Sequence, residues 1–302
     1  MSNPILVIAR QELRAARTNR LSVLLLAIFI GMVLVSGFIG WATHHTVTQV
    51  YEESLQQGIT SAPNPFSGQM PLELIQNSVI YVILIGALAA IVLGVHSSLD
   101  DRKAGAIDLI FSRPLSTRQY VSGKLLGLQT ITGAALLIAA ITSWAIIFLI
   151  RSEMLSLSVT LSLIEFFFLA WLFLVPFSAL GFISGSVSKR ETSSLLIPIL
   201  VWVFTAFMLP QLGTAEHPVS LLNPVRAQPV SQGSFLEFNH AVIGPFSITD
   251  RFKGASAVLL HLEGATGSPA FDWLALLAVG LIACLLAVFT VRLKRLRRPL
   301  YE

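Results

Sequence analysis

Long runs of apolar residues alternate with short polar segments along this chain. Five runs of about 20 to 30 residues contain no Asp, Glu, Lys or Arg, and a sixth, residues 154–188, is interrupted only by Glu165. About 20 helical residues cross a hydrocarbon core of about 30 Å, and a helix satisfies its own backbone polar groups in lipid. The pattern therefore predicts an all-α integral membrane protein with six transmembrane helices at residues 21–43, 77–99, 125–150, 160–186, 193–212 and 272–291.

The basic residues predict how these spans are oriented. Sixteen of the 20 lysines and arginines precede the first span, follow the sixth, or lie between spans two and three or four and five. Because cytoplasmic segments of membrane proteins are rich in Lys and Arg, we expect both termini to be cytoplasmic. The first apolar run is longer than the core of a signal peptide, so we expect it to be retained as a span.

The overall composition excludes several classes of protein. Hydrophobic residues make up 54% of the 302 residues and charged residues only 12%, with a mean hydropathy of +0.76, whereas soluble domains contain about 25% charged residues. A single cysteine, Cys284, excludes a disulfide scaffold. The net charge of +4 comes from clusters beside the apolar runs, which is not the basic face of a nucleic-acid-binding protein.

The first 20 residues are too polar to span a membrane. On a helix, Ile5, Ala9, Leu13 and Ala16 form one apolar stripe with arginines beside it. This pattern predicts an amphipathic helix over residues 1–20, lying in the inner headgroup region. A basic orientation signal without fixed structure is the alternative.

The cytoplasmic loop 100–124 carries the clearest local signals. A short apolar group predicts a helical turn that Pro114 ends, and Ser116 with Gln119 forms a capping box at the start of the third span. The apolar residues of this turn are Ile107, Leu109, Ile110 and Phe111. Such a face in the cytosol needs a partner protein to cover it, unless it packs on its own neighbours.

Two long segments lie on the opposite side of the membrane. Residues 46–73 contain three prolines and no basic residue, and we expect a loop or a short helix there. Residues 213–271 form a long extracytoplasmic loop with five prolines and two moderately apolar stretches. Short helices in or on the outer leaflet are expected in this loop.

Motifs for catalysis are missing from the sequence. The only Gly-Lys pair, Gly123-Lys124, lacks the rest of a Walker A motif, and no protease or hydrolase signature is present. The six histidines do not have the spacing of metal ligands. We therefore predict no enzymatic activity and no catalytic, cofactor or metal site in this chain.

Glu165 is the only acidic residue inside a predicted span, since Asp272 is the first residue of the sixth span. An ionisable side chain at membrane depth is costly and usually functional, which makes Glu165 a candidate for a translocation path. Structural pairing, for instance with Arg151, is the alternative. Ion-coupled carriers normally have several such groups or paired repeats of broken helices, and this chain shows one carboxylate and no repeat.

The segment from Arg102 to Gly127 resembles the signature of ABC-2 type permeases. It reads RKAGAIDLIFSRPLSTRQ and then GKLLG, and the earlier IARQEL and RTNR are similar to the family's N-terminal amphipathic helix. Lys103 and Ala106 depart from the Glu and Thr that are usual in the family. Within the family, residues 185–194 and 221–226 are similar to the NosY type, the permease of the ATPase-driven system that supports maturation of nitrous oxide reductase.

The resemblance implies a homodimer of six-span subunits in a bacterial or archaeal inner membrane, bound to two copies of a separate ATPase that holds the ATP. Closure of the ATPase pair would tilt the spans, either to export a molecule or to transmit force to a periplasmic accessory protein. Residues 107–111 would form the main coupling helix and 187–194 a second contact. The implied contact residues are Ile107, Asp108, Leu109, Ile110, Phe111, Arg113, Lys189, Arg190 and Glu191.

Two other functions stay open on the sequence. A channel or secondary carrier would work through Glu165 without an ATPase. A membrane scaffold would anchor another protein, and the loop 213–271 would then function without the spans. A neighbouring reading frame with Walker A and Walker B motifs would favour the permease over both.

Overall fold

The computed structural model describes residues 3–62, 71–103, 105–112, 114–151, 154–214, 223–224, 238, 241–262 and 268–297. In chain order its helices are α1 (Pro4–Thr18), α2 (Arg20–Gln56), α3 (Asn77–Tyr81), α4 (Ala87–Lys103), α5 (Ala106–Ile110), α6 (Thr117–Arg151), α7 (Leu157–Val187), α8 (Glu191–Val203), α9 (Leu209–Thr214), α11 (Ile248–Leu259), α12 (Ala270–Thr290) and α13 (Leu293–Leu296). Short 3-10 turns lie at Pro71–Ile75 and Gly244–Phe246. Single π-helical turns, Val82–Gly86 and Phe204–Met208, join α3 to α4 and α8 to α9.

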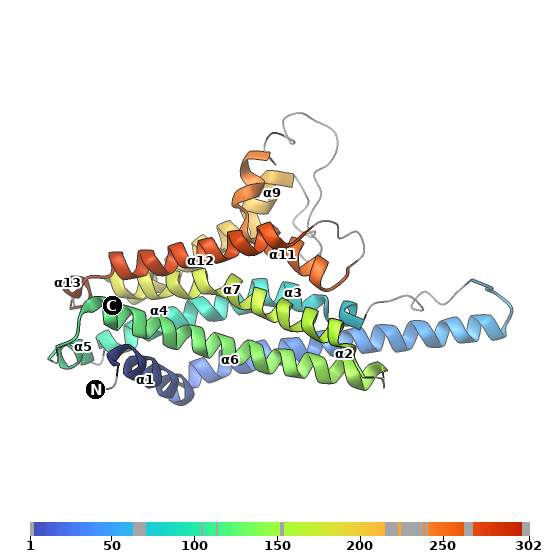
Figure 1. Ribbon diagram of the computed structural model, residues 1–302, viewed down its shortest axis with the longest axis horizontal. Helices are drawn as coiled ribbons and strands as arrows, with labels where there is room; N and C mark the ends of the chain where they lie inside the picture. The colour runs from blue at the N-terminus through green and yellow to red at the C-terminus, as the bar shows by residue number, and fades with distance from the viewer. Residues whose placement is uncertain are drawn as a thin grey trace.

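Six helical stretches among the described residues are long and apolar enough to cross a membrane, which confirms the six predicted spans. They run side by side along the long axis of the molecule, with α1, α5 and α13 together at one end (Figure 1). This end carries the N-terminal arginines and the basic residues that follow α4, α7 and α12, so we call it the basic end. By the charge rule it is the end expected to be cytoplasmic.

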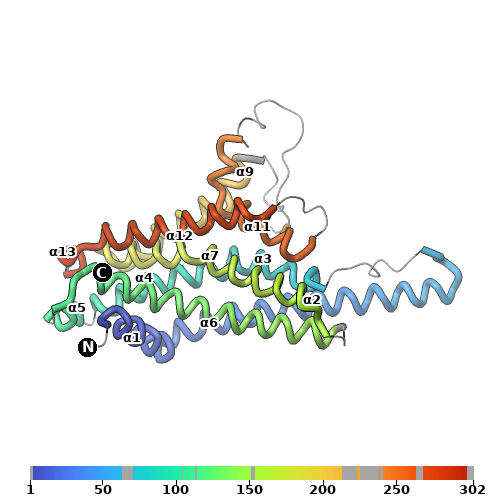
Figure 2. The backbone as a smooth tube through the Cα atoms, in the orientation of Figure 1, coloured from blue at the N-terminus to red at the C-terminus, as the bar shows by residue number. Residues whose placement is uncertain are grey.

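The first span is longer than its apolar run. Helix α2 continues to Gln56 and extends beyond the other helices at the end opposite to the basic end (Figure 2). It stops at Gly58, whose φ of +68° is accessible to glycine. The Gly58 amide bonds to the Leu55 carbonyl and the Ile59 amide to the Ser54 carbonyl, a Schellman motif that satisfies the last carbonyls of the helix.

Helices α4 and α7 pack closely at the centre of the bundle. The Gly94 backbone lies against the Ser178 carbonyl and the Gly181 backbone against the Ile91 carbonyl, with no room for a Cβ atom at either glycine. The Ser98 and Ser186 hydroxyls share a 2.8 Å hydrogen bond across the same seam. Small residues thus bring the two backbones together, as they do between helices in lipid generally.

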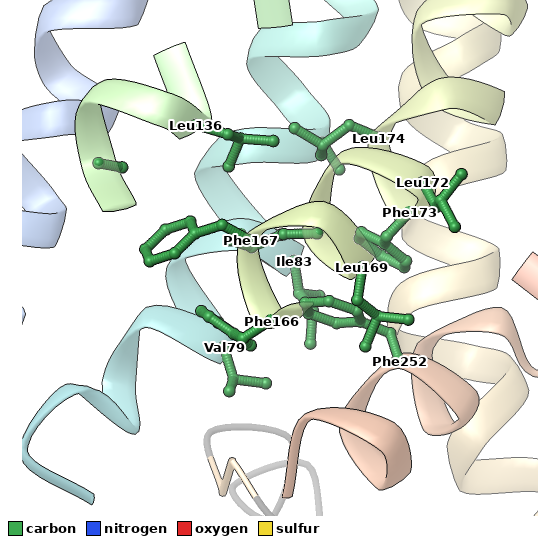
Figure 3. Close-up of a cluster of buried hydrophobic side chains, with 14 of the residues drawn as sticks. Val79, Ile83, Leu136, Phe166, Phe167, Leu169, Leu172, Phe173, Leu174 and Phe252 are labelled. Atoms are coloured by element: carbon green, nitrogen blue, oxygen red, sulfur yellow. The ribbon is translucent and has the colours of Figure 1, made fainter. Parts of the chain in front are cut away.

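The long outer segment contributes to the core. Helix α11 packs against α7 and α12, and its Phe252 is fully buried between Phe166 and Phe173 of α7 (Figure 3). The Phe252 and Phe173 rings stack with their centroids 4.6 Å apart. Arg251 stabilises this arrangement, because its guanidinium pairs with Asp272 of α12 at 2.8 Å. A helix was expected in this region, but its burial inside the bundle was not.

Candidate coupling surface at the basic end

Helix α5 projects from the end of α4 at the basic end. Gly105, with a φ of +62°, makes the turn between the two helices. Ile107 is buried against the bundle, and the Phe111 ring contacts Tyr120 of α6 with a centroid distance of 5.5 Å. Ile110 is half-buried. Part of the apolar face predicted for this turn is therefore covered by the permease itself.

The outward side of α5 presents one apolar and one acidic residue. Leu109 is 78% exposed, the highest value among the described large apolar side chains of the basic end. The Asp108 carboxylate is also exposed and pairs with the Arg297 guanidinium, next to α13, at 2.8 Å. Arg113 lies outside the described residues.

The second predicted contact lies between α7 and α8 and is tied to the same end of α4. Lys189 and Arg190 are exposed, and Glu191 pairs with Lys103 at 2.8 Å. The neighbouring Arg102 donates hydrogen bonds to the carbonyls of Gly185 at 2.6 Å and Ser188 at 2.9 Å, which caps the end of α7. Displacement of either predicted contact would therefore act on α4.

A buried ion cluster lies just behind α5. The Lys124 ammonium contacts the Glu12 carboxylate at 2.6 Å, the Asp101 carboxylate at 2.8 Å and the Ser97 carbonyl at 2.9 Å. The Tyr120 hydroxyl donates to the same Asp101 oxygen at 2.7 Å. Three helices, α1, α4 and α6, are joined by these contacts. Burial leaves the charges little access to water, so the cluster depends on its internal pairing.

The placement of Glu12 explains how α1 binds the bundle. Its buried side chain lies with Ile8 and Ala9 on the inner face of α1, while Arg10 and Arg14 are exposed. The facing residues of α6 are Gly123 and Gly127, where an added Cβ atom would lie 2.7 Å from the Ile8 Cβ and 2.6 Å from the Glu12 Cβ. The sequence indicated the stripe but not the role of Glu12. In the sequence, the Gly-Lys-x-x-Gly spacing of α6 was the available sign that another helix packs closely against this face.

Glu165 lies apart from the basic end. It is exposed on α7, eight residues after the helix begins at Leu157, which corresponds to about 12 Å along the axis. Within the described part of the chain it has no ion pair, and the side chain of its predicted partner Arg151 is outside that part. The structure therefore does not bring Glu165 together with the other predicted site residues.

The described residues show no metal-binding constellation. No three of their His, Cys, Asp or Glu side chains converge as ligands of one ion would. Two of the histidines, His217 and His240, lie outside the described residues. At the basic end, apolar packing holds α5 against the bundle, while the Arg102 cap and the half-exposed Lys103–Glu191 pair hold the segment between α7 and α8 to α4.

Comparison with known proteins gives one family match. The family described as "ABC-2 family transporter protein" matches residues 6–295, nearly the whole chain. A search of curated proteins finds no matching sequence.

Proposed function

The chain belongs to the ABC-2 transporter family, and we propose that it is the permease subunit that converts ATP hydrolysis by a separate ATPase into movement of its spans. As a multi-pass membrane component of an ABC transporter it would act as a homodimer with two copies of the ATPase. The charge distribution supports a cytoplasmic location of the basic end. The resemblance to the family suggests the cytoplasmic membrane of a bacterium or archaeon. The ATP would be bound by the ATPase.

The attachment of the exposed α5 to α4 carries this proposal. Leu109 and Asp108 are available to a partner, while Ile107 anchors the other side of the helix in the bundle. Any push on α5 passes to α4, which packs tightly along α7. Because packed helices with little free volume move as units, a small displacement at the basic end would reach the opposite end.

A more specific proposal is that this permease has a role in the maturation of nitrous oxide reductase. It rests on the similarity of residues 185–194 and 221–226 to the NosY type. In that role the permease would transmit force to a periplasmic accessory protein, while in a general exporter it would move a molecule. Residues 185–194 contribute the cap at the end of α7 and the Lys103–Glu191 pair.

An ion-coupled carrier or channel is the second candidate function, because Glu165 places an exposed carboxylate on a membrane helix. This candidate predicts that Glu165→Gln abolishes transport and that no ATPase is bound. The permease proposal predicts that the ATPase stays bound when Glu165 is replaced.

Copurification in mild detergent tests the proposal. We expect a soluble protein with Walker A and Walker B motifs to copurify with the wild-type chain at equal stoichiometry. Leu109→Asp should remove most of it, because a charge replaces the most exposed apolar contact of α5. Leu109→Asp is a more specific test than Phe111→Asp, because the Phe111 ring also packs on Tyr120 and its replacement would disturb the bundle.

A matched control makes the same change at the other end of the molecule. Leu55 is 49% exposed and is the last residue but one of α2. The C-terminal end of α2 lies at the opposite end of the molecule from α5 (Figure 1), so Leu55→Asp should leave the ATPase bound. Wild-type levels of ATPase with Leu109→Asp would contradict the assignment of α5. Recovery of the wild-type chain alone would favour the carrier.

A further inference from the structure

A cavity of about 330 Å³ lies between the start of α6 and the end of α12, at the basic end. Thr117 and Arg118 line it from the first turn of α6, and Phe289 and Arg292 line it from the last turn of α12 and the residues that follow. None of the described residues that line it is acidic. The volume lies within the range of about 300 to 1,000 Å³ that is usual for small-ligand sites.

The two arginines of this cavity carry charges that the described residues do not neutralise. Within the described part of the chain, neither the Arg118 nor the Arg292 guanidinium lies within ion-pair distance of a carboxylate. By contrast, Lys103, Lys124 and Arg297 at the same end each pair with a carboxylate at 2.6 to 2.8 Å. Two unneutralised positive charges at one cavity favour an anionic ligand.

Both guanidiniums are positioned by the local structure. The Arg118 guanidinium carbon lies 5.5 Å from the centre of the Phe289 ring, a cation–π contact that joins α6 to α12. Arg292 follows the last turn of α12, where Val291 and Arg292 take extended backbone conformations. The Val291 side chain is buried and fixes the chain at this point. Planar groups with several N–H donors each thus border one cavity, and arginines bind phosphate oxygens with such groups.

The length of α12 places this cavity at the membrane surface. The helix has 21 residues, about the number that crosses the hydrocarbon core, and Arg292 lies two residues beyond its end. Arg118 lies at the same level, because its guanidinium contacts Phe289. The charges therefore lie at the depth of the headgroups on the side that the charge rule assigns to the cytoplasm. Basic pockets between membrane helices on this side bind anionic headgroups in other proteins.

An apolar face of α12 leads from the cavity into the membrane. Phe289, Leu286, Leu285 and Ile282 follow one another at a spacing of three, four and seven residues, which places them on one side of the helix. Each of them is 52% to 61% exposed. A ligand with its phosphate in the cavity can lay an acyl chain along this face. The combination of a basic cavity and an apolar face is typical of a site for a phospholipid.

We propose that this cavity binds a phosphate group through Arg118 and Arg292, with an anionic inner-leaflet phospholipid or a free phosphate ester as its source. The phosphate of phosphatidylglycerol has no cation of its own, whereas the trimethylammonium group of phosphatidylcholine neutralises its phosphate. Two arginines without carboxylate partners therefore distinguish these headgroups. The proposal does not depend on the ATPase or on the cargo.

Native mass spectrometry of the purified full chain tests this proposal. The delipidated protein would be titrated with phosphatidylglycerol and with phosphatidylcholine of the same acyl chains. We expect phosphatidylglycerol to bind about 25-fold more tightly, because each arginine contributes about fivefold to the binding of an anionic headgroup. Arg118→Gln and, separately, Arg292→Gln should each lower this preference about fivefold.

Two control variants separate the site from the general charge of the basic end and from folding. Arg14→Gln removes an exposed arginine of α1, which does not line the cavity, and should keep the preference. Arg118→Lys keeps the positive charge beside Phe289 and should keep most of the preference. A loss in Arg118→Gln that Arg118→Lys restores is therefore a loss of charge and not of packing.

Titration with glycerol phosphate, which has no acyl chain, identifies the source of the phosphate. Binding of glycerol phosphate that depends on both arginines, with equal binding of the two lipids, would identify a free phosphate ester. Equal lipid binding without binding of glycerol phosphate would overturn the proposal. A preference that is unchanged in both glutamine variants of the cavity, or that falls equally in Arg14→Gln, would overturn it as well.

Discussion

The central and the outer helices of this bundle are similarly apolar but differ in the share of their residues that is buried inside the protein. Each span has a most apolar window of 18 residues. In this window, 78% of the residues are buried in α7 and 72% in the span that contains α4, against 17% in the spans that contain α8 and α12. Glycines allow the close packing of the central pair. Gly94 and Gly181 permit backbone contact between α4 and α7, whereas Gly31 of α2 has nothing within contact distance of an added Cβ. Apolar character thus places a helix in the membrane, and the glycines of α4 and α7 let these two helices pack backbone to backbone at the centre.

The largest expected effect distinguishes a buried ion pair from a half-exposed one. Lys124→Met leaves the buried carboxylates of Glu12 and Asp101 unpaired and should lower the free energy of unfolding by about 3 to 5 kcal/mol. Lys103→Met breaks only the half-exposed pair with Glu191 and should cost about 1 kcal/mol or less. Unfolding in mixed micelles, followed by tryptophan fluorescence, measures both. Similar losses for the two variants would show that the cluster is not shielded from water.

A smaller effect is expected from a matched pair of glycine substitutions. Gly181→Val should destabilise the protein by about 3 kcal/mol, because its Cβ would collide with the Ile91 carbonyl and force the two helices apart. Gly31→Val makes the same change on α2, where the space is open, and should change stability by less than about 1 kcal/mol. Thermal unfolding in detergent compares them. Equal melting temperatures would contradict the close packing of α4 on α7.

The smallest effect concerns a local feature that depends little on the bundle. Ser116 accepts from the Gln119 amide at 3.2 Å, and the Gln119 side chain accepts from the Ser116 amide at 3.0 Å. Ser116→Ala should cost about 1 kcal/mol and increase hydrogen exchange at the Gln119 amide about fivefold. Gln119→Glu keeps an acceptor and should exchange almost as slowly as the wild type. Unchanged exchange in Ser116→Ala would mean that water replaces the cap.

The predicted capping box and the six spans were readable from the sequence because both depend on neighbouring residues. The helical extension of α2 was partly readable, since residues 44–56 contain neither glycine nor proline and Gly58 follows. The loss of apolar character after residue 43 suggested a loop instead. A helix that leaves the membrane does not need an apolar surface, so hydropathy does not mark its end.

The burial of α11 and of Glu12 could not be read in the same way. Residues 248–259 contain four charged or polar side chains in their first six positions, which is typical of an exposed helix. Arg251 is buried because Asp272 lies opposite it on α12. Glu12 is buried because Lys124 lies opposite it on α6. Each partner is distant in the sequence, and a single chain gives no sign of the pairing.

The sequence by itself determined the membrane class, the six spans, the expected orientation and the local helix starts, because lipid, charge bias and caps act on each segment separately. Only the tertiary structure decided that α4 and α7 form the centre, that Ile107 of α5 is buried in the bundle while Leu109 faces outward, and that Lys124 lies in a buried ion cluster. These features depend on which helices meet. In a chain whose spans are all similarly apolar, that choice is made by close packing and by buried pairs between distant residues.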